Sequence, residues 1–274
     1  MYQRLNHLIK SKKSLLCIGL DPVMEKLPLH IRKMNDPFFE FNKTIIDATH
    51  DLVIAYKPNT AFYEALGTIG LHQLKLTCDY IKHTYPEVLI ILDAKRADIG
   101  NTNQGYVTFA FDLLDADMIT LHPYLGKEAM LPFLQRKDKG SIFLCKTSNT
   151  GSNEFQSLEV GNRPLYQHIA QEISEKWNEN KNCLLVVGAT YPNELKKVRE
   201  LVGDMPILVP GIGAQGGDLQ NTLDAGLTIN HNGLIISSSR EIIYAGNDSN
   251  FAEESRKKTE MLWTEMNTSS IPLH

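Results

Sequence analysis

The sequence has no apolar run that approaches the ~20 residues needed to span a membrane as a helix. Its first ten residues follow an amphipathic helical pattern, without the continuous apolar stretch of a signal peptide. It also has no excess of positive charge, since 28 Lys and Arg residues face 32 Asp and Glu residues and give a net charge of −4. Nucleic-acid-binding domains are usually basic. The composition therefore predicts a cytoplasmic protein that binds neither membranes nor nucleic acids.

Paired cysteines and metal-binding motifs are also missing. The four cysteines, Cys17, Cys78, Cys145 and Cys183, are far apart in the sequence and form no C-x-x-C pair. Three of them lie in apolar runs, where a free cysteine behaves as a small hydrophobic residue. The sequence contains no H-E-x-x-H motif and no G-x-S-x-G motif of a nucleophilic serine. We therefore expect reduced thiols, no metal site and no Ser–His–Asp triad.

What the sequence does contain is a regular series of short apolar runs. Its 274 residues, 42% of them hydrophobic, allow one or two domains, and no Pro- or Gly-rich linker divides them. Near-continuous apolar strands indicate a parallel sheet that is buried on both faces. Eight runs rich in Ile, Leu and Val recur, at residues 14–21, 53–59, 88–95, 117–123, 140–148, 183–190, 206–213 and 233–240.

Stretches with helical spacing of apolar residues separate these runs. A strand followed by a helix, eight times over, is typical of a (β/α)8 TIM barrel. We predict an α/β fold with this barrel as a single domain over residues 1–266, followed by a C-terminal tail over 267–274. An open doubly wound sheet is the alternative. The helical stretches are residues 38–52, 71–85, 102–114, 164–177, 193–202 and 251–266.

Charged residues cluster where the predicted strands end, which in a barrel is the face that carries the active site. The third strand ends in Asp93-Ala-Lys95-Arg-Ala-Asp98, and the second carries Lys57. Residues i and i+2 of a strand share a face, so Asp93 and Lys95 should point together into the barrel mouth. Such alternating charge can keep Lys95 protonated as a proton donor and can set Asp93 against an anionic substrate group. The alternative is an ion-pair network that only closes the barrel.

A glycine-rich segment, Gly211-Ile-Gly213-Ala-Gln215-Gly216-Gly217-Asp218, follows the seventh predicted strand. It contains G-x-G-x-x-G, but it lies far from the first βαβ unit, where a dinucleotide-binding fingerprint belongs. Arg240 follows the eighth strand, and a glycine-rich loop together with an arginine is what the phosphate site of a barrel needs. The alternative is a tight turn that needs glycine for its backbone angles, which leaves Arg240 unexplained.

The longest interval between predicted strands holds a polar stretch without periodicity at residues 148–162. It follows a strand, so in a barrel it lies on the active-site face, where a loop of this length is often a lid or a binding loop. We expect this loop and segment 213–218 to close over a bound ligand.

Together these segments resemble the orotidine 5′-phosphate decarboxylase family, most of all its longer bacterial members. The matching segments keep the same order and a consistent spacing: Gly19-Leu-Asp21-Pro, Tyr56-Lys57-Pro-Asn, residues 93–102, Thr147-Ser148-Asn-Thr-Gly151 and residues 210–218. The resemblance implies a homodimeric barrel that converts orotidine 5′-monophosphate (OMP) to UMP and CO2 without a cofactor or metal, in pyrimidine nucleotide biosynthesis.

The resemblance also implies catalytic roles for the charged residues. Lys95 would protonate C6 of the pyrimidine as CO2 leaves, and Asp93 would lie beside the substrate carboxylate. Lys57 would hold Asp93 and a ribose hydroxyl. Asp98 and Thr102 would reach the active site of the neighbouring subunit.

The other matching residues would bind the substrate. Asp21 would contact the ribose, and Ser148 would hydrogen-bond the pyrimidine amide. Gln215, with Gly216 beside it, and Arg240 would contact the phosphate.

One position departs from the family pattern. Ser239, after Ser238, precedes Arg240 where many relatives have glycine. If the backbone N–H of that glycine approaches the phosphate, the contact would differ in this chain.

Two other functions stay open on the sequence. Sugar-phosphate decarboxylases on the same barrel share the third-strand motif, but they use Mg²⁺ and carry a glutamate on the second strand, where this chain has Lys57. A non-catalytic barrel that only binds a phosphorylated ligand would not need the array of Lys and Asp residues.

Overall fold

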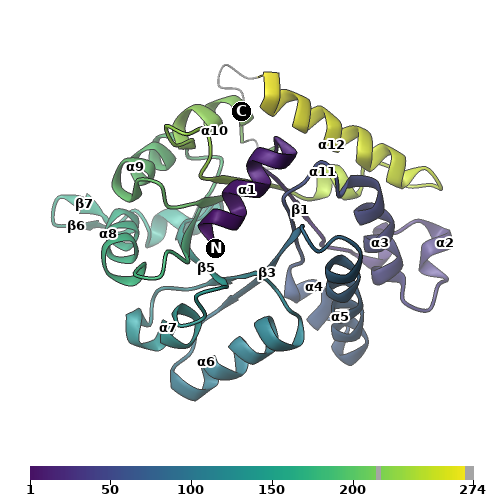
Figure 1. The fold of residues 1–274 in the computed structure, drawn as a ribbon, viewed down its shortest axis with the longest axis horizontal. Helices are drawn as coiled ribbons and strands as arrows, with labels where there is room; N and C mark the ends of the chain where they lie inside the picture. The colour runs from purple at the N-terminus through teal and green to yellow at the C-terminus, as the bar shows by residue number, and fades with distance from the viewer. Residues whose placement is uncertain (214–216, 269–274) are drawn as a thin grey trace.

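The computed structural model describes residues 1–213 and 217–268, which form a closed barrel of eight parallel strands in the order β1-β10-β9-β8-β5-β4-β3-β2 (Figure 1). Each strand coincides with one of the eight apolar runs. The predicted TIM barrel is therefore confirmed, and the open doubly wound sheet is wrong. The strands are β1 (Leu16–Gly19), β2 (Ala55–Lys57), β3 (Leu89–Arg96), β4 (Met118–Leu121), β5 (Gly140–Lys146), β8 (Cys183–Val187), β9 (Ile207–Pro210) and β10 (Leu234–Ser238).

The barrel strands are apolar because both of their faces are covered. Every residue of β1, β4 and β8 is buried, with one face toward the barrel interior and the other toward the surrounding helices. The last strand pairs with the first, and Leu16 lies opposite Ile236 at this seam. No strand edge of the barrel is left open.

The six predicted helical stretches all form helices, and two of them, α6 and α8, end in a π-helical turn (Thr108–Leu113 and Ile173–Trp177). The helices α7 and α10 were not predicted, since α7 contains Pro132 and α10 has only eight residues. The helices are α1 (Tyr2–Lys12), α2 (Leu29–Arg32), α3 (Pro37–Thr49), α4 (Thr60–Glu64), α5 (Gly67–Thr84), α6 (Gly100–Val107), α7 (Gly126–Leu134), α8 (Leu165–Glu172), α9 (Pro192–Val202), α10 (Leu219–Gly226), α11 (Arg240–Ile243) and α12 (Phe251–Thr268).

Helix α1 lies across the end of the barrel at which the strands begin (Figure 1). Its residues Leu5, Leu8 and Ile9 are buried. The Tyr2 hydroxyl donates a hydrogen bond to the carbonyl oxygen of Cys183, the first residue of β8, at 2.5 Å. Helix α1 therefore covers the end of the barrel at which the strands begin.

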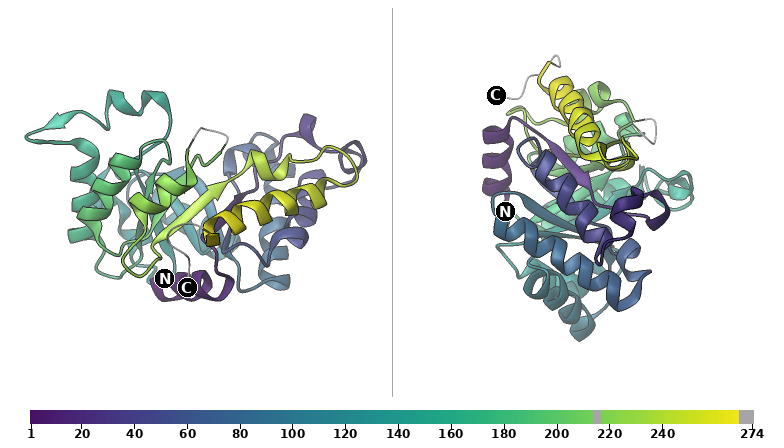
Figure 2. Two further views of the ribbon diagram at one scale, coloured as in Figure 1. Left: turned by 90° about the horizontal axis from the view of Figure 1, so that it is seen from above. Right: turned by 90° about the vertical axis from the view of Figure 1, so that its right-hand side faces the viewer.

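The predicted loop 148–162 contains regular structure that its polar sequence did not indicate. It holds a 3-10 turn (Thr150–Glu154) and the strand β6 (Glu159–Val160), which pairs antiparallel with β7 (Arg163–Pro164). Figure 2 (left) shows this teal hairpin projecting beyond the helices, with α1 at the opposite end of the molecule.

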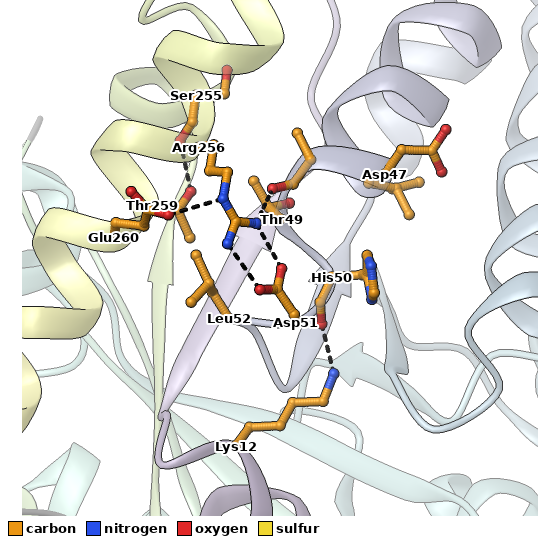
Figure 3. Close-up of polar contacts among 12 residues, drawn as sticks. Lys12, Asp47, Thr49, His50, Asp51, Leu52, Ser255, Arg256, Thr259 and Glu260 are labelled. Carbon is orange, nitrogen blue, oxygen red and sulfur yellow. Dashed lines mark hydrogen bonds and ion pairs between the residues drawn. The ribbon is translucent and has the colours of Figure 1, made fainter.

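Hydrogen bonds and an ion pair join the last helix, α12, to the turn after α3 (Figure 3). The Arg256 guanidinium donates to both carboxylate oxygens of Asp51 at 2.8 and 2.9 Å, and also to the carbonyl oxygen of Ala48. From the other side, the Lys12 ammonium of α1 donates to the carbonyl oxygen of His50 at 2.6 Å. One short turn thus joins the first and the last helix to the barrel.

Two sequence predictions concern the chain as a whole. All four cysteines are free and buried, as predicted. Helix α12 continues to Thr268, so the tail expected from residue 267 would begin inside this helix, and residues 269–274 lie outside the described residues. None of the described helices is both long and apolar enough to cross a membrane.

Candidate active site

A cavity of about 620 Å³ opens where the barrel strands end. Ligand sites in proteins commonly measure about 300 to 1,000 Å³, so a mononucleotide is within its range. The cavity brings together six of the residues singled out in the sequence, which come from five different strand ends. They are Asp21, Lys57, Asp93, Lys95, Ser148 and Arg240.

Three charged side chains form a chain of contacts on the wall of this cavity. The Lys57 ammonium donates to Asp93 Oδ2 at 3.0 Å, and the Lys95 ammonium donates to Asp93 Oδ1 at 2.6 Å. Lys57 and Asp93 are buried, with 6% and 8% of their surface exposed, whereas the Lys95 side chain is 44% exposed. The buried Lys57 ammonium is therefore held in its ion pair with Asp93, whereas the Lys95 ammonium is accessible to a ligand.

The carboxylate of Asp93 is also held by two neutral side chains that the sequence did not single out. The Thr120 hydroxyl donates to Asp93 Oδ1 at 2.9 Å, and the Asn59 amide donates to Oδ2 at 3.4 Å. Thr120 accepts the backbone N–H of Lys95 at 3.0 Å. The carboxylate is thus fixed in one orientation by donors from three neighbouring strand ends.

Lys95 has an unusual backbone conformation. Its φ is +48°, in the left-handed region that a residue with a side chain rarely adopts. The pairing of β3 with β4 shifts register between Leu92 and Arg96. Asp93 and Lys95 therefore meet as predicted, but through a local distortion of the strand end rather than through the regular alternation of a strand. Such strain is a recurring feature of functional sites.

The buried charges stabilise one another's ionised forms. Burial alone would raise the pKa of Asp93, but the Lys57 and Lys95 ammonium groups outweigh it and hold this pKa well below its usual range. Burial would lower the pKa of Lys57, but the Asp93 and Asp21 carboxylates raise it above its usual value. Burial, with a smaller effect of Lys95, lowers the pKa of the nearby His122. At neutral pH the site therefore holds a charged Lys57 and a charged Asp93 beside a neutral His122 imidazole.

Asp21 is oriented by Ser239, the residue that departs from the family pattern. The Ser239 hydroxyl donates to Asp21 Oδ2 at 2.7 Å, and the Asn59 backbone N–H donates to Oδ1 at 3.2 Å. The φ of Ser239 is −132°, outside the left-handed region that favours glycine. The serine instead supplies a hydrogen bond that glycine could not make.

The predicted phosphate region is described in part. Gly211 and Gly213 have φ angles of +101° and +72°, so the turn does require glycine at both positions. Hydrogen bonds from Gly213 to Gly217 and from Gly217 to Gly211 close the base of the loop. Arg240 and Gly211 both line the cavity. The predicted phosphate contacts Gln215 and Gly216 lie outside the described residues.

Two predicted site residues do not line the cavity of their own chain. Asp98 accepts the backbone N–H of Ile99 at 2.7 Å, and its own N–H donates to Asn103 Oδ1. Thr102 is exposed on the first turn of α6. Both residues lie after the strand end that carries Lys95.

Comparison with known proteins agrees with this geometry. Residues 14–255 match the family described as "Orotidine 5′-phosphate decarboxylase / HUMPS family". The chain belongs to this family. Orotidine 5′-phosphate decarboxylases from Janthinobacterium sp. (strain Marseille) and Cellvibrio japonicus are 49% and 50% identical to it, over 93% of this chain and 93% of each relative. The structure of the Leishmania donovani OMP decarboxylase superimposes with a TM-score of 0.81 at 38% identity, over 96% of this chain and 98% of that one.

The alternative based on Mg²⁺ would place a glutamate on the second strand. In this decarboxylase-family chain, β2 ends in Lys57, whose ammonium occupies one oxygen of Asp93. Among residues 1–213 and 217–268, no three His, Cys, Asp or Glu side chains are grouped so that they could hold a metal ion. The cations that contact Asp93 are the ammonium groups of Lys57 and Lys95.

Proposed function

We propose that the protein decarboxylates OMP to UMP and CO2, a step of pyrimidine nucleotide biosynthesis, as a carboxy-lyase that needs no cofactor. The observation that carries this proposal is the Lys57–Asp93–Lys95 contact chain inside the cavity of a barrel from this family. A cytoplasmic location fits the proposal, because a dianionic nucleotide does not cross membranes unaided.

The chemistry explains why such an array is needed. When the bond from C6 to the carboxylate breaks, the electron pair stays on C6 as a localised carbanion, since the ring offers no electron sink. The Lys95 ammonium stabilises this charge and transfers one proton to C6, and solvent then restores the proton to the amine. Asp93 keeps Lys95 in place and lies where the substrate carboxylate must approach. Contacts to the distant phosphate can supply the binding energy for this approach.

An absorbance assay with OMP tests the proposal directly. The purified protein should convert OMP to UMP at the same rate with and without excess EDTA. Activity that chelation abolishes would favour the Mg²⁺-dependent sugar-phosphate alternative. Binding of OMP without conversion would favour the non-catalytic phosphate-binding barrel.

Arg240 is proposed to bind the phosphate, together with Gln215 and Gly216. Replacing Arg240 with alanine should raise KM for OMP about 10- to 100-fold, the effect of losing charge-assisted hydrogen bonds worth about 1.5–3 kcal/mol. On orotidine, which has no phosphate, Arg240→Ala and the unchanged protein should react equally slowly. Steady-state kinetics on both substrates make the comparison, and equal losses on both would contradict a role at the phosphate.

Asp98 and Thr102 are proposed to complete the active site of a second subunit in a homodimer. Support comes from their position outside their own cavity and from Ile99 between them, whose apolar side chain is 61% exposed.

Mixing two inactive variants tests the shared site. Lys95→Ala and Asp98→Ala homodimers should each be inactive, and a refolded equimolar mixture should recover about a quarter of the full activity. About half of the dimers would be mixed, and each of these would hold one complete site. If Asp98 acted within its own chain, mixing would restore nothing.

A further inference from the structure

A second buried lysine of the active-site face has no part in the mechanism above. Lys146, the last residue of β5, has no exposed surface. Its ammonium donates to Asn153 Oδ1 at 2.7 Å and to the hydroxyls of Ser152 and Ser157, each at 3.1 Å. Within the described part of the chain, Lys146 forms no ion pair with a carboxylate. All three acceptors belong to the segment that follows β5.

Burying an ammonium group without a carboxylate costs free energy, so its neutral partners must hold it firmly. The ring of Tyr191, which precedes α9, lies 4.6 Å from the Lys146 ammonium and adds a cation–π contact. The Ser152 hydroxyl lies 3.4 Å from the Tyr191 hydroxyl. Lys146 therefore joins the loop after β5 to the loop after β8.

The same loop reaches the cavity on its other side. Ser148 and Gln156 both line the cavity. The Gln156 side chain accepts the backbone N–H of Thr147 at 2.8 Å and donates to the Thr147 hydroxyl at 2.9 Å. Residues 147–157 thus form a closed loop with Lys146 at its base, and four of them line the cavity: Thr147, Ser148, Asn149 and Gln156. We name these residues the lid loop.

We propose that Lys146 is a positioning residue, whose buried ammonium orders the lid loop so that Ser148 and Gln156 are in place before the substrate binds. This inference rests on the proposed function, because it takes Ser148 as the residue that hydrogen-bonds the pyrimidine amide, as the family resemblance implies. Lys146 itself does not touch the substrate. Its effect is to raise the fraction of free protein that is competent to bind the base, and hence to lower KM.

The first test needs no substrate. Amide hydrogen exchange of residues 150–157 should be about 10-fold faster or more in Lys146→Met than in the unchanged protein, and Lys146→Arg should restore slow exchange. Lys139 offers a matched control, since it is also buried, lies just before the same strand and pairs with Asp115 at the opposite end. Lys139→Met should leave this segment unaffected. Unchanged exchange in Lys146→Met would overturn the proposal.

The second test uses ligands that differ in the base. Lys146→Met should raise KM for OMP about 10-fold with a much smaller change in kcat, the pattern of a lost fraction of binding-competent protein. Its affinity for UMP should fall likewise, but not its affinity for ribose 5-phosphate, which has no base. Equal losses for both ligands, or a loss in kcat alone, would overturn the proposal.

A variant on the surface serves as a control in case Lys146→Met, which changes a buried residue, does not fold. Asn153 is exposed and accepts the shortest of the three Lys146 hydrogen bonds, so Asn153→Ala should fold normally and show the same changes to a smaller extent. If it showed none in either test, the lid loop would not depend on Lys146. If the unchanged protein failed to decarboxylate OMP, the proposed function would be wrong, whereas the exchange test would still decide whether Lys146 orders the loop.

Discussion

Lys95→Ala is expected to lose at least about 10⁴-fold in kcat, because one ammonium both stabilises the carbanion at C6 and protonates it. Binding should survive, since the phosphate and ribose contacts come from other strand ends. The affinity for UMP, measured by calorimetry, should stay within about threefold of its original value. The structure explains why kcat should fall while binding survives. Lys95 is the exposed member of the Lys57–Asp93–Lys95 chain and adds little to the packing of the barrel.

A second lysine of the same cavity provides the control for this experiment. Lys26 lines the cavity but is exposed, and its ammonium lies over the ring of Tyr244 rather than beside Asp93. Lys26→Ala should keep kcat within about threefold, as expected for a surface charge that does not reach the reacting atoms. Activity of Lys95→Ala within about 100-fold of the original would contradict the assignment of Lys95 as the proton donor.

Asp93→Ala is expected to damage both stability and activity. It removes the carboxylate that compensates the buried Lys57 ammonium, and breaking a buried pair in this way typically costs about 3–5 kcal/mol. Lys95 loses its shortest contact at the same time, so kcat/KM should fall by at least about 10³-fold. Urea unfolding and steady-state kinetics measure the two losses. Asp93→Asn, which keeps the shape but not the charge, should lose most of the activity too.

The stability lost in Asp93→Asn should depend on pH in a defined direction. The pKa of Asp93 is lowered in the folded protein, so its ionised form contributes stability fully above about pH 4, the usual value for an aspartate. This contribution is lost as the pH falls toward the lowered pKa. The difference in unfolding free energy between the unchanged protein and Asp93→Asn should therefore shrink below about pH 4. A difference that stayed constant down to pH 2 would contradict the low pKa.

The sequence predicted the barrel well because its strands are buried on both faces. Such strands must be apolar along their whole length, and an uninterrupted run such as Leu16–Gly19 is easy to recognise. The charged site was predictable for the same reason, since Asp93 and Lys95 stand out directly after an apolar run. Helix α7 was missed because it contains Pro132, and α10 because its eight residues are too few to repeat a pattern.

The hydrogen bonds that orient the charged site residues could not be predicted, because they come from residues that are distant in the sequence. Thr120 and Asn59 are ordinary polar residues until the pairing of β2, β3 and β4 brings them to Asp93. Ser239 was identified as a departure from the family, but its hydrogen bond to Asp21 requires the closure of β10 onto β1. The sequence places Lys146 at the end of the fifth apolar run, but its role could not be predicted, since its acceptors lie in a loop without periodicity.

The seam at which Leu16 meets Ile236 has a consequence for how the protein is made. During synthesis, β1 leaves the ribosome early, whereas its partner β10 is made late. The edge of β1 that pairs with β10 therefore stays unpaired until almost the whole barrel has emerged. Pairing between such distant segments is also slow to form. The nascent chain is therefore most exposed to aggregation just before it is complete. Variants that weaken this seam should lower the yield of soluble protein at high expression temperature more than they lower the stability of the finished enzyme.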